Sequence, residues 1–233
     1  MGASPVLLVH GAWGGAWAWG YVQAELEKRG ITSVAIDLPS RDAAPSTLSD
    51  DAAAVRAALD ELDQPAVVVG HSYSGAVITE ASAGNDQVAH LVYVCAILPD
   101  EGESTFSLMG QDSTPSTLGE AIQATDDGLS TLDPVGAKTD LFNDVTQEQA
   151  DPIIAGLGTH RLSVFGEAPA GLGWKEHPST YVLTSQDRVF SPDLQRQMAG
   201  KATNVVTVDA GHIPLLSRPA ELADAIAKAA NAA

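Results

Sequence analysis

The chain has 233 residues, of which 45% are hydrophobic and 18% are charged, and its formal net charge is −18. This share of apolar residues is enough for a buried core and excludes a disordered chain. The negative charge argues against nucleic acid and anionic membrane surfaces as partners. No run of about 18 apolar residues is present, so we expect no membrane span. The first five residues lack the basic start of a signal peptide, and we therefore expect a cytoplasmic protein.

Short apolar runs alternate with helical patterns along the chain. Continuous β-branched runs are typical of strands covered on both faces, and alternation with helices is typical of βαβ units. The sequence therefore predicts an α/β fold with about six mostly parallel strands flanked by helices. In chain order the pattern predicts a strand at 5–10, a helix at 16–29, a strand at 31–36, a helix at 50–62, a strand at 66–69, a helix at 73–83, strands at 91–95, 180–183 and 205–208, and a helix at 219–230.

The stretch from Pro99 to Trp174 interrupts this alternation. It contains helical patches and many turn residues but no clear strand, and its 13 acidic and 2 basic residues give it a net charge of −11. We interpret residues 99–174 as a mostly helical cap inserted between two core segments, 1–98 and 175–233. The simplest explanation of its charge is a solvated surface. The alternative is a cap that shapes a pocket and disfavours anionic substrates through its negative field.

The strongest chemical signal is the sequence Gly-His-Ser-Tyr-Ser-Gly at residues 70–75. A predicted strand runs directly into this turn and a helix follows at once, as in the nucleophile elbow of hydrolases. Ser72 would then project from the carboxyl edge of the sheet, where open α/β sheets bind ligands. The usual elbow pattern is G-x-S-x-G, but here Ser74 stands at the last position and Gly75 follows. Serine is small enough for the turn to survive, although an ordinary turn with a capping serine is the alternative.

A serine nucleophile needs a base, and the base needs an orienting acid. Of the six histidines, His212 lies between the last predicted strand and the last helix, on a loop at the same edge as Ser72. Asp187 follows the strand at 180–183 and is the expected acid. Asp209 is its rival, but it lies only three residues before the histidine, so its side chain is less suited to reach behind the imidazole.

An oxyanion hole needs two backbone N–H donors near the nucleophile. We assign one to Tyr73, directly after the serine, and the other to Ala12, in the glycine-rich loop after the first strand. The glycines of that loop do not form the G-x-G-x-x-G pattern of dinucleotide sites, and no Gly-Lys-Ser/Thr follows, which disfavours a nucleotide site.

Residues near these groups are candidates for a substrate pocket, although aromatic and methionine side chains in a cap often only pack. Trp17 and Trp19 are expected to pack within the first helix, and the single cysteine, Cys95, is expected to be buried and inert. One cysteine excludes a disulfide framework and a multi-cysteine zinc site. The pocket candidates are Gly11, Trp13, Phe106, Leu108, Met109, Phe142 and Ile213.

Several motifs in this order resemble the α/β-hydrolase superfamily. They include Val-His-Gly-Ala-Trp at 9–13, Gly-His-Ser-Tyr at 70–73, Gln-Asp-Arg at 186–188 and Gly-His at 211–212. Within the superfamily the chain is most similar to the branch of plant hydroxynitrile lyases and hormone methyl-ester esterases, with their bacterial relatives. The resemblance covers nearly the whole chain. It implies a six-stranded core with a helical cap between the fourth and fifth strands.

Two departures separate this chain from the lyases of that branch. Those lyases share a threonine after the histidine of the first strand and a lysine after the histidine of the triad. This chain has Gly11 and Ile213 at these two positions. Lyase chemistry of this type needs the lysine charge near the leaving cyanide, so the resemblance favours ester hydrolysis. Epoxide hydrolases and haloalkane dehalogenases of the superfamily use an aspartate nucleophile, and Ser72 argues against both.

The sequence therefore predicts a serine carboxylesterase that cleaves a small-to-medium neutral ester through an acyl-enzyme on Ser72. No metal and no organic cofactor is implied, and the expected partner is a small-molecule ester. The alternatives are a lyase of the hydroxynitrile type or another cofactor-free C–C lyase, an amidase or thioesterase, and a non-catalytic ligand-binding protein on the same fold. No long exposed apolar stripe indicates an interface with another chain. The sequence therefore does not predict which oligomeric state the protein adopts.

Overall fold

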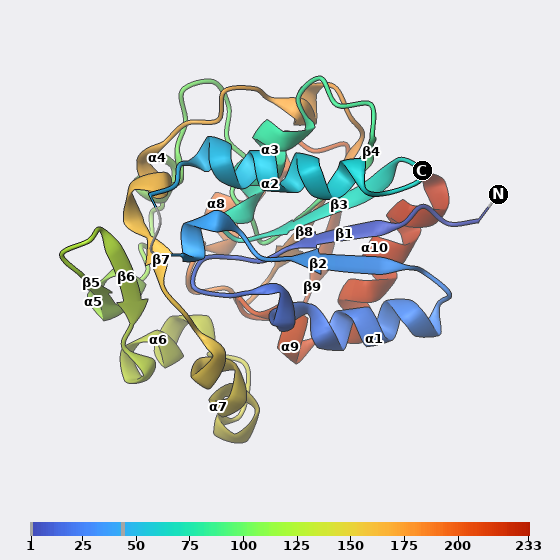
Figure 1. The fold of residues 1–233 in the computed structure, drawn as a ribbon. Coiled ribbons are helices and arrows are strands. Elements are labelled where there is room, and N and C mark those ends of the chain that lie inside the picture. The colour runs from blue at the N-terminus through green and yellow to red at the C-terminus, as the bar shows by residue number, and fades with distance from the viewer. Residues whose placement is uncertain (1, 43–44) are drawn as a thin grey trace.

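A sheet of six parallel strands forms the centre of the computed structural model, which describes residues 2–42 and 45–233 (Figure 1). The strands lie in the order β2-β1-β3-β4-β8-β9, and every neighbouring pair is parallel. This confirms the α/β fold with six mostly parallel strands that the sequence predicts. The strands are β1 (Val6–Val9), β2 (Ser33–Ile36), β3 (Ala66–His71), β4 (Val88–Val94), β8 (Ser179–Thr184) and β9 (Asn204–Val208).

The burial of the strands follows their position in the sheet. The four inner strands are almost wholly buried, as their continuous apolar runs predict. The two edge strands are not, since Val34 of β2 is 42% exposed and Val205 of β9 is 51% exposed. The expectation of strands covered on both faces is therefore wrong at the edges of the sheet.

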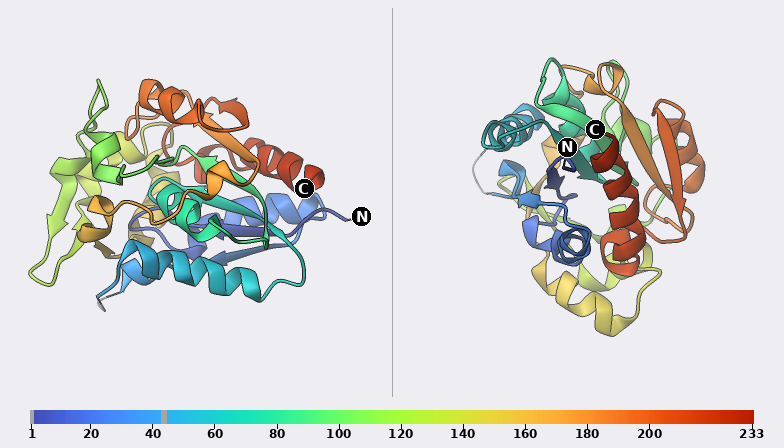
Figure 2. Two further views of the ribbon diagram at one scale, coloured as in Figure 1. Left: turned by 90° about the horizontal axis from the view of Figure 1, so that it is seen from above. Right: turned by 90° about the vertical axis from the view of Figure 1, so that its right-hand side faces the viewer.

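Helices cover both faces of the sheet (Figures 1 and 2). Two hydrophobic clusters result, one with α2, α3 and α8 and the other with α1 and α10. Each helix expected for the core is present, whereas α8, a helix of eight residues of which four are polar, was not predicted. In the part of the chain that the structure describes, no helix has the length and apolar character needed to cross a bilayer. These elements are η1 (Ala16–Trp19), α1 (Gly20–Lys28), η2 (Pro39–Arg41), α2 (Leu48–Asp60), α3 (Ser74–Ser82), α8 (Pro192–Ala199), α9 (Pro214–Ser217) and α10 (Pro219–Ala232).

The segment between β4 and β8, residues 99–174, is called the cap below. Its central part, residues 105–166, lies beyond the carboxyl ends of the strands, at the end of the molecule opposite both termini (Figure 1). Helices are the main regular structure of the cap, but it also holds a three-stranded antiparallel sheet that the sequence did not indicate, because these strands have only two to four residues. Its elements are α4 (Thr105–Met109), α5 (Leu118–Ala121), β5 (Ile122–Ala124), β6 (Leu129–Leu132), α6 (Pro134–Leu141), α7 (Gln147–Gly156), β7 (His160–Arg161), η3 (Leu162–Gly166) and η4 (Gly173–Lys175).

Candidate active site

Ser72 lies in the sharp turn between β3 and α3. Its φ angle is +56°, in the left-handed region that residues other than glycine rarely adopt. The end of β4 and the loop after it hold this backbone on both sides: the Ser72 N–H donates to the Val94 carbonyl at 3.2 Å, and the Ser72 carbonyl accepts from the Ile97 N–H at 3.0 Å. The turn therefore has the strained geometry of a nucleophile elbow and presents the serine side chain at the carboxyl edge of the sheet.

Ser74, which replaces the usual elbow glycine, contributes to the turn. Its buried hydroxyl lies 2.9 Å from the carbonyl oxygens of both Val9 and His71, so it links the ends of β1 and β3. The turn requires a glycine at the next position, because a Cβ atom at Gly75 would collide with the carbonyl oxygen of Ile97. The turn survives the serine because the close backbone approach is at position 75.

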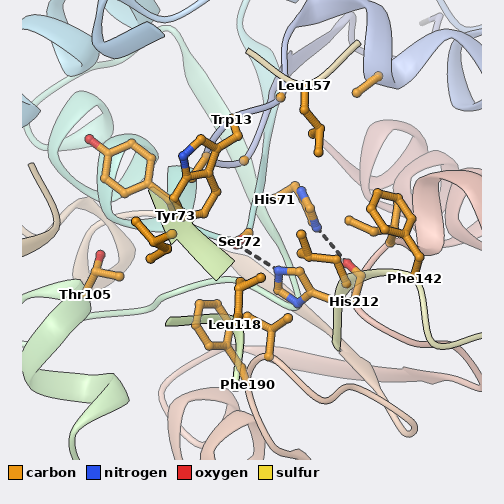
Figure 3. Close-up of a pocket in the computed structure, with 18 of the residues that line it drawn as sticks. Trp13, His71, Ser72, Tyr73, Thr105, Leu118, Phe142, Leu157, Phe190 and His212 are labelled. Carbon is orange, nitrogen blue, oxygen red and sulfur yellow. Dashed lines mark hydrogen bonds between the residues drawn. The ribbon is translucent and has the colours of Figure 1, made fainter. Parts of the chain in front are cut away.

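The three residues expected to form a catalytic triad meet at this edge. The Nε2 atom of His212 lies 2.9 Å from the Ser72 hydroxyl oxygen, and its Nδ1 atom lies 2.8 Å from Oδ2 of Asp187 (Figure 3 shows the first contact). All three side chains are buried. Ser72 follows β3, His212 follows β9 and Asp187 follows β8. Because the carboxyl ends of these parallel strands meet at one edge, residues up to 140 positions apart come together.

Asp187 is held by many hydrogen bonds. Its Oδ1 atom accepts from the backbone N–H groups of Val189 and Phe190, at 2.7 and 3.0 Å. Its Oδ2 atom accepts from the Thr184 hydroxyl at 3.0 Å and from the Gln195 side-chain amide at 2.9 Å, in addition to the histidine. This network fixes the carboxylate in one orientation behind the imidazole.

Gln195 was missed by the sequence analysis, because a single glutamine in a short polar helix gives no signal of a buried role. Asp209, the rival acid, is exposed and accepts from the Ser185 hydroxyl and the Gln186 side-chain amide, both at 2.7 Å. Its carboxylate is therefore engaged away from His212.

The backbone around Ser72 leaves two donors free. Within residues 2–42 and 45–233, the N–H groups of Ala12 and Tyr73 donate to no other protein group. The loop that carries Ala12 also comes very close to the serine, since a Cβ atom at Gly11 would lie 3.0 Å from the Ser72 Cβ atom. Free N–H groups at these two positions support the predicted oxyanion hole.

Tyr73 has a second set of contacts that the sequence analysis missed. Its hydroxyl donates to Oδ2 of the buried Asp51 at 2.9 Å, and its ring packs edge-on against His160 and Phe165 of the cap. Burial raises the pKa of Asp51. These contacts fix the residue whose backbone N–H is a candidate oxyanion donor.

A cavity of about 170 Å³ lies between Ser72 and the cap (Figure 3). Its lining is almost entirely apolar, and among the described residues it contains no aspartate, glutamate, lysine or arginine. Cap elements α4 to α7 supply one wall, and the segments that carry Ala12, Ser72 and His212 supply the other. The lining includes the predicted residues Gly11, Trp13, Phe106, Met109, Phe142 and Ile213.

Two expectations about this region are wrong. Leu108 does not line the cavity; it is 1% exposed and packs into the core, because it points away from the face of α4 that carries Phe106 and Met109. Trp17 is not simply a packing residue, since it lines the cavity and is 39% exposed, whereas Trp19 is fully buried as expected.

His71, Cys95 and His212 place three possible metal-binding atoms within 4.8 Å of one another. These groups already have partners within the protein. The His71 Nε2 atom lies 2.8 Å from the His212 carbonyl oxygen, and the Cys95 thiol donates to the same oxygen at 3.4 Å. Both ring nitrogens of His212 contact the other members of the candidate triad. The cluster therefore fits a role in holding the His212 loop better than a role as a metal site.

Three buried histidines make the stability of the fold depend on pH. Burial lowers the pKa of His10 to about 4 and the pKa values of His71 and His160 to about 3. In the unfolded chain each titrates near 6.5, so below that pH the unfolded state binds protons that the folded state does not. We expect the free energy of unfolding to fall from pH 6.5 to 5, by up to about 1.4 kcal/mol per pH unit for each histidine.

Chemical unfolding followed at pH 7, 6 and 5 tests this expectation. The His160→Gln variant provides the comparison, because it removes one of the three groups and should show a shallower fall between pH 6 and 5. A free energy of unfolding that stays constant between pH 6.5 and 5 would contradict the prediction.

The chain is similar to known proteins in sequence and in structure. A model of the alpha/beta hydrolase family matches residues 6–225. The chain belongs to this family. An alpha/beta hydrolase of Aspergillus novofumigatus, nvfD, is 33% identical over 216 residues, which cover 85% of each chain. Methylesterase 8 of Arabidopsis thaliana is 26% identical, and the match covers 94% of this chain and 86% of the plant protein.

The structure also matches a solved member of the family. The crystal structure of a pyrethroid hydrolase from Sphingobium faniae JZ-2 superposes with a TM-score of 0.87 and 26% sequence identity, covering 98% of each chain. The matches confirm the resemblance to the alpha/beta hydrolases and to their plant methylesterase branch. This protein is thus an alpha/beta hydrolase of the esterase type.

Proposed function

We propose that the protein is a serine carboxylesterase that cleaves neutral, apolar esters of small to medium size. The observation that carries this proposal is the hydrogen-bonded chain from Ser72 through His212 to Asp187, at 2.9 and 2.8 Å, next to two free backbone donors. A nucleophile, a base, an orienting acid and an oxyanion hole are the four parts that acyl transfer needs.

The proposed reaction has two steps. Ser72 attacks the ester carbonyl while His212 takes the hydroxyl proton, and the Ala12 and Tyr73 N–H groups stabilise the oxyanion. His212 then gives the proton to the leaving alcohol, which departs and leaves the acyl group on the serine. A water molecule attacks this acyl-enzyme, with the same histidine as base, and releases the acid. Asp187 keeps the imidazole in the tautomer that can accept the serine proton.

The cavity indicates the class of ester. Its uncharged, apolar lining would not stabilise a charged group on either half of the substrate, since burying an unpaired charge is costly. The acidic cap adds a negative field at long range. The cavity favours a neutral ester with apolar acyl and alcohol groups, and the negative field disfavours anionic esters.

A specific observation weighs against hydroxynitrile-lyase chemistry. A Cβ atom at Gly11 would lie 2.8 Å from the Nδ1 atom of His71 and 3.0 Å from the Ser72 Cβ atom. This loop therefore has no room for the threonine of the lyases without a shift, and Ile213 supplies no positive charge.

Hydrolysis of two matched p-nitrophenyl esters tests the proposal. We expect kcat/KM for p-nitrophenyl butyrate to exceed that for the hemisuccinate, which carries a carboxylate, by about 100-fold, because the apolar cavity lacks a cation. A fluorophosphonate should inactivate the enzyme at one site per chain. A chain that hydrolyses neither ester and does not react with the fluorophosphonate would favour the ligand-binding alternative, and preferred cleavage of the anionic ester would contradict the proposed substrate class.

A further inference from the structure

A four-residue segment of the cap, residues 141–144, contacts both the cavity and the triad loops. Leu141 and Phe142, at the end of α6, line the cavity. The next two residues, Asn143 and Asp144, turn away from it and bond to core loops instead. The same short segment therefore forms a wall of the cavity and reaches the backbone that carries the candidate catalytic residues.

Asp144 holds the backbone of Gly211, the residue that precedes His212. Its Oδ2 atom accepts from the Gly211 N–H at 2.7 Å. On the other side of the histidine, the His212 carbonyl accepts from His71 and from the Cys95 thiol. The backbone around the proposed base is thus held by the cap at Gly211 and by the core at the His212 carbonyl.

Asn143 makes the equivalent contact with the acid loop. Its side-chain amide donates to the carbonyl of Gln186 at 2.9 Å, and Gln186 is the residue before Asp187. Two adjacent cap residues thus bond to the residues that directly precede the proposed acid and base. A shift of the cap segment would therefore move both loops.

Gly211 shows how closely the cap fits here. A Cβ atom at this position would collide with Oδ1 of Asn143 and lie 2.7 Å from Oδ1 of Asp144. Both oxygens are buried, and neither has a hydrogen-bond partner in the described part of the chain. The approach of the cap to the histidine loop therefore requires a glycine.

From these contacts we propose that Asn143 and Asp144 are positioning residues, through which the cap sets the alignment of Asp187 and His212. The inference rests on the proposed function of the triad and adds that the core alone does not complete it. Because Phe142 lines the cavity next to this pair, a substrate seated against it would press on the segment that aligns the catalytic groups.

Kinetics of four variants of the full chain test this inference. Asp144→Ala removes the acceptor for the Gly211 N–H, and we expect kcat for p-nitrophenyl butyrate to fall by about 10- to 100-fold with KM changed less than about twofold. Asp144→Asn keeps an acceptor oxygen and should recover kcat to within about threefold of wild type. Asn143→Ala should lower kcat by about 3- to 10-fold. Glu148→Ala, which removes an exposed acid of the same cap, is the matched control and should leave kcat unchanged.

The outcomes separate this inference from the proposed function. A wild-type enzyme that fails to react with both ester and fluorophosphonate would refute the proposed function itself. A reactive wild type would instead refute the positioning role if Asp144→Ala kept its kcat, if only KM rose, or if Asp144→Asn lost as much as Asp144→Ala. Circular dichroism and thermal unfolding would show whether each variant folds. If Asp144→Ala did not fold, Asn143→Ala would carry the test, and an unchanged kcat in it would overturn the inference.

Discussion

Replacing Ser72 by alanine is expected to abolish both ester hydrolysis and fluorophosphonate labelling, with kcat reduced by about 10⁴-fold or more. The expected loss is large because the hydroxyl is the atom that forms the acyl-enzyme, and no other serine contacts His212 in the described residues. The oxyanion donors and the cavity remain in the variant, so substrate binding should persist. Burst-phase kinetics with a p-nitrophenyl ester and mass spectrometry of the labelled protein measure both effects.

Ser113→Ala is a suitable control for this variant, since Ser113 is an exposed serine of the cap. It should retain full labelling and turnover. If Ser72→Ala still reacted with the probe at one site per chain, the nucleophile would be another residue and the proposed mechanism would be wrong.

Asp187→Asn is expected to lower kcat by about 10⁴-fold while the protein remains folded. The carboxylate accepts the hydrogen of His212 Nδ1, which leaves Nε2 free to accept the proton of Ser72. An amide that presents its NH₂ group to the imidazole would favour the other tautomer, in which Nε2 carries the hydrogen and cannot act as a base. The pH dependence of kcat/KM and the rate of fluorophosphonate inactivation check this expectation.

Asp209→Asn provides the matched control for the acid. Asp209 is exposed and bonds to Ser185 and Gln186 rather than to the histidine, so its loss should change kcat by less than about threefold. A larger effect from Asp209→Asn than from Asp187→Asn would reverse the assignment of the acid.

The sequence predicted the groups that depend on short motifs and on strand order. The turn at 70–75, and the places of Asp187 and His212 after two late strands, follow from local patterns and from the parallel sheet. The contacts of Asp51, Asn143 and Gln195 do not, because each depends on how segments far apart in the chain pack together. The short cap strands were also missed, since two to four residues are too few for a period to show.

Pocket residues were predicted less reliably than triad residues for a related reason. Successive residues on a helix point about 100° apart, and the sequence of α4 does not show which face meets the cavity. Leu108 was therefore placed in the pocket although it packs into the core, and Trp17 was expected to pack within the first helix although it lines the cavity.

The candidate active site and the two chain termini lie at opposite ends of the central strands. Ser72, His212, the free backbone donors and the cavity lie at the carboxyl edge beneath the cap, whereas both chain termini lie at the opposite edge (Figure 1). A tag or a surface linkage at either terminus would therefore leave the cavity open to solution. Substitutions near the termini would likewise make no contact with the reacting atoms. Immobilisation of this hydrolase can thus be engineered separately from its choice of substrate.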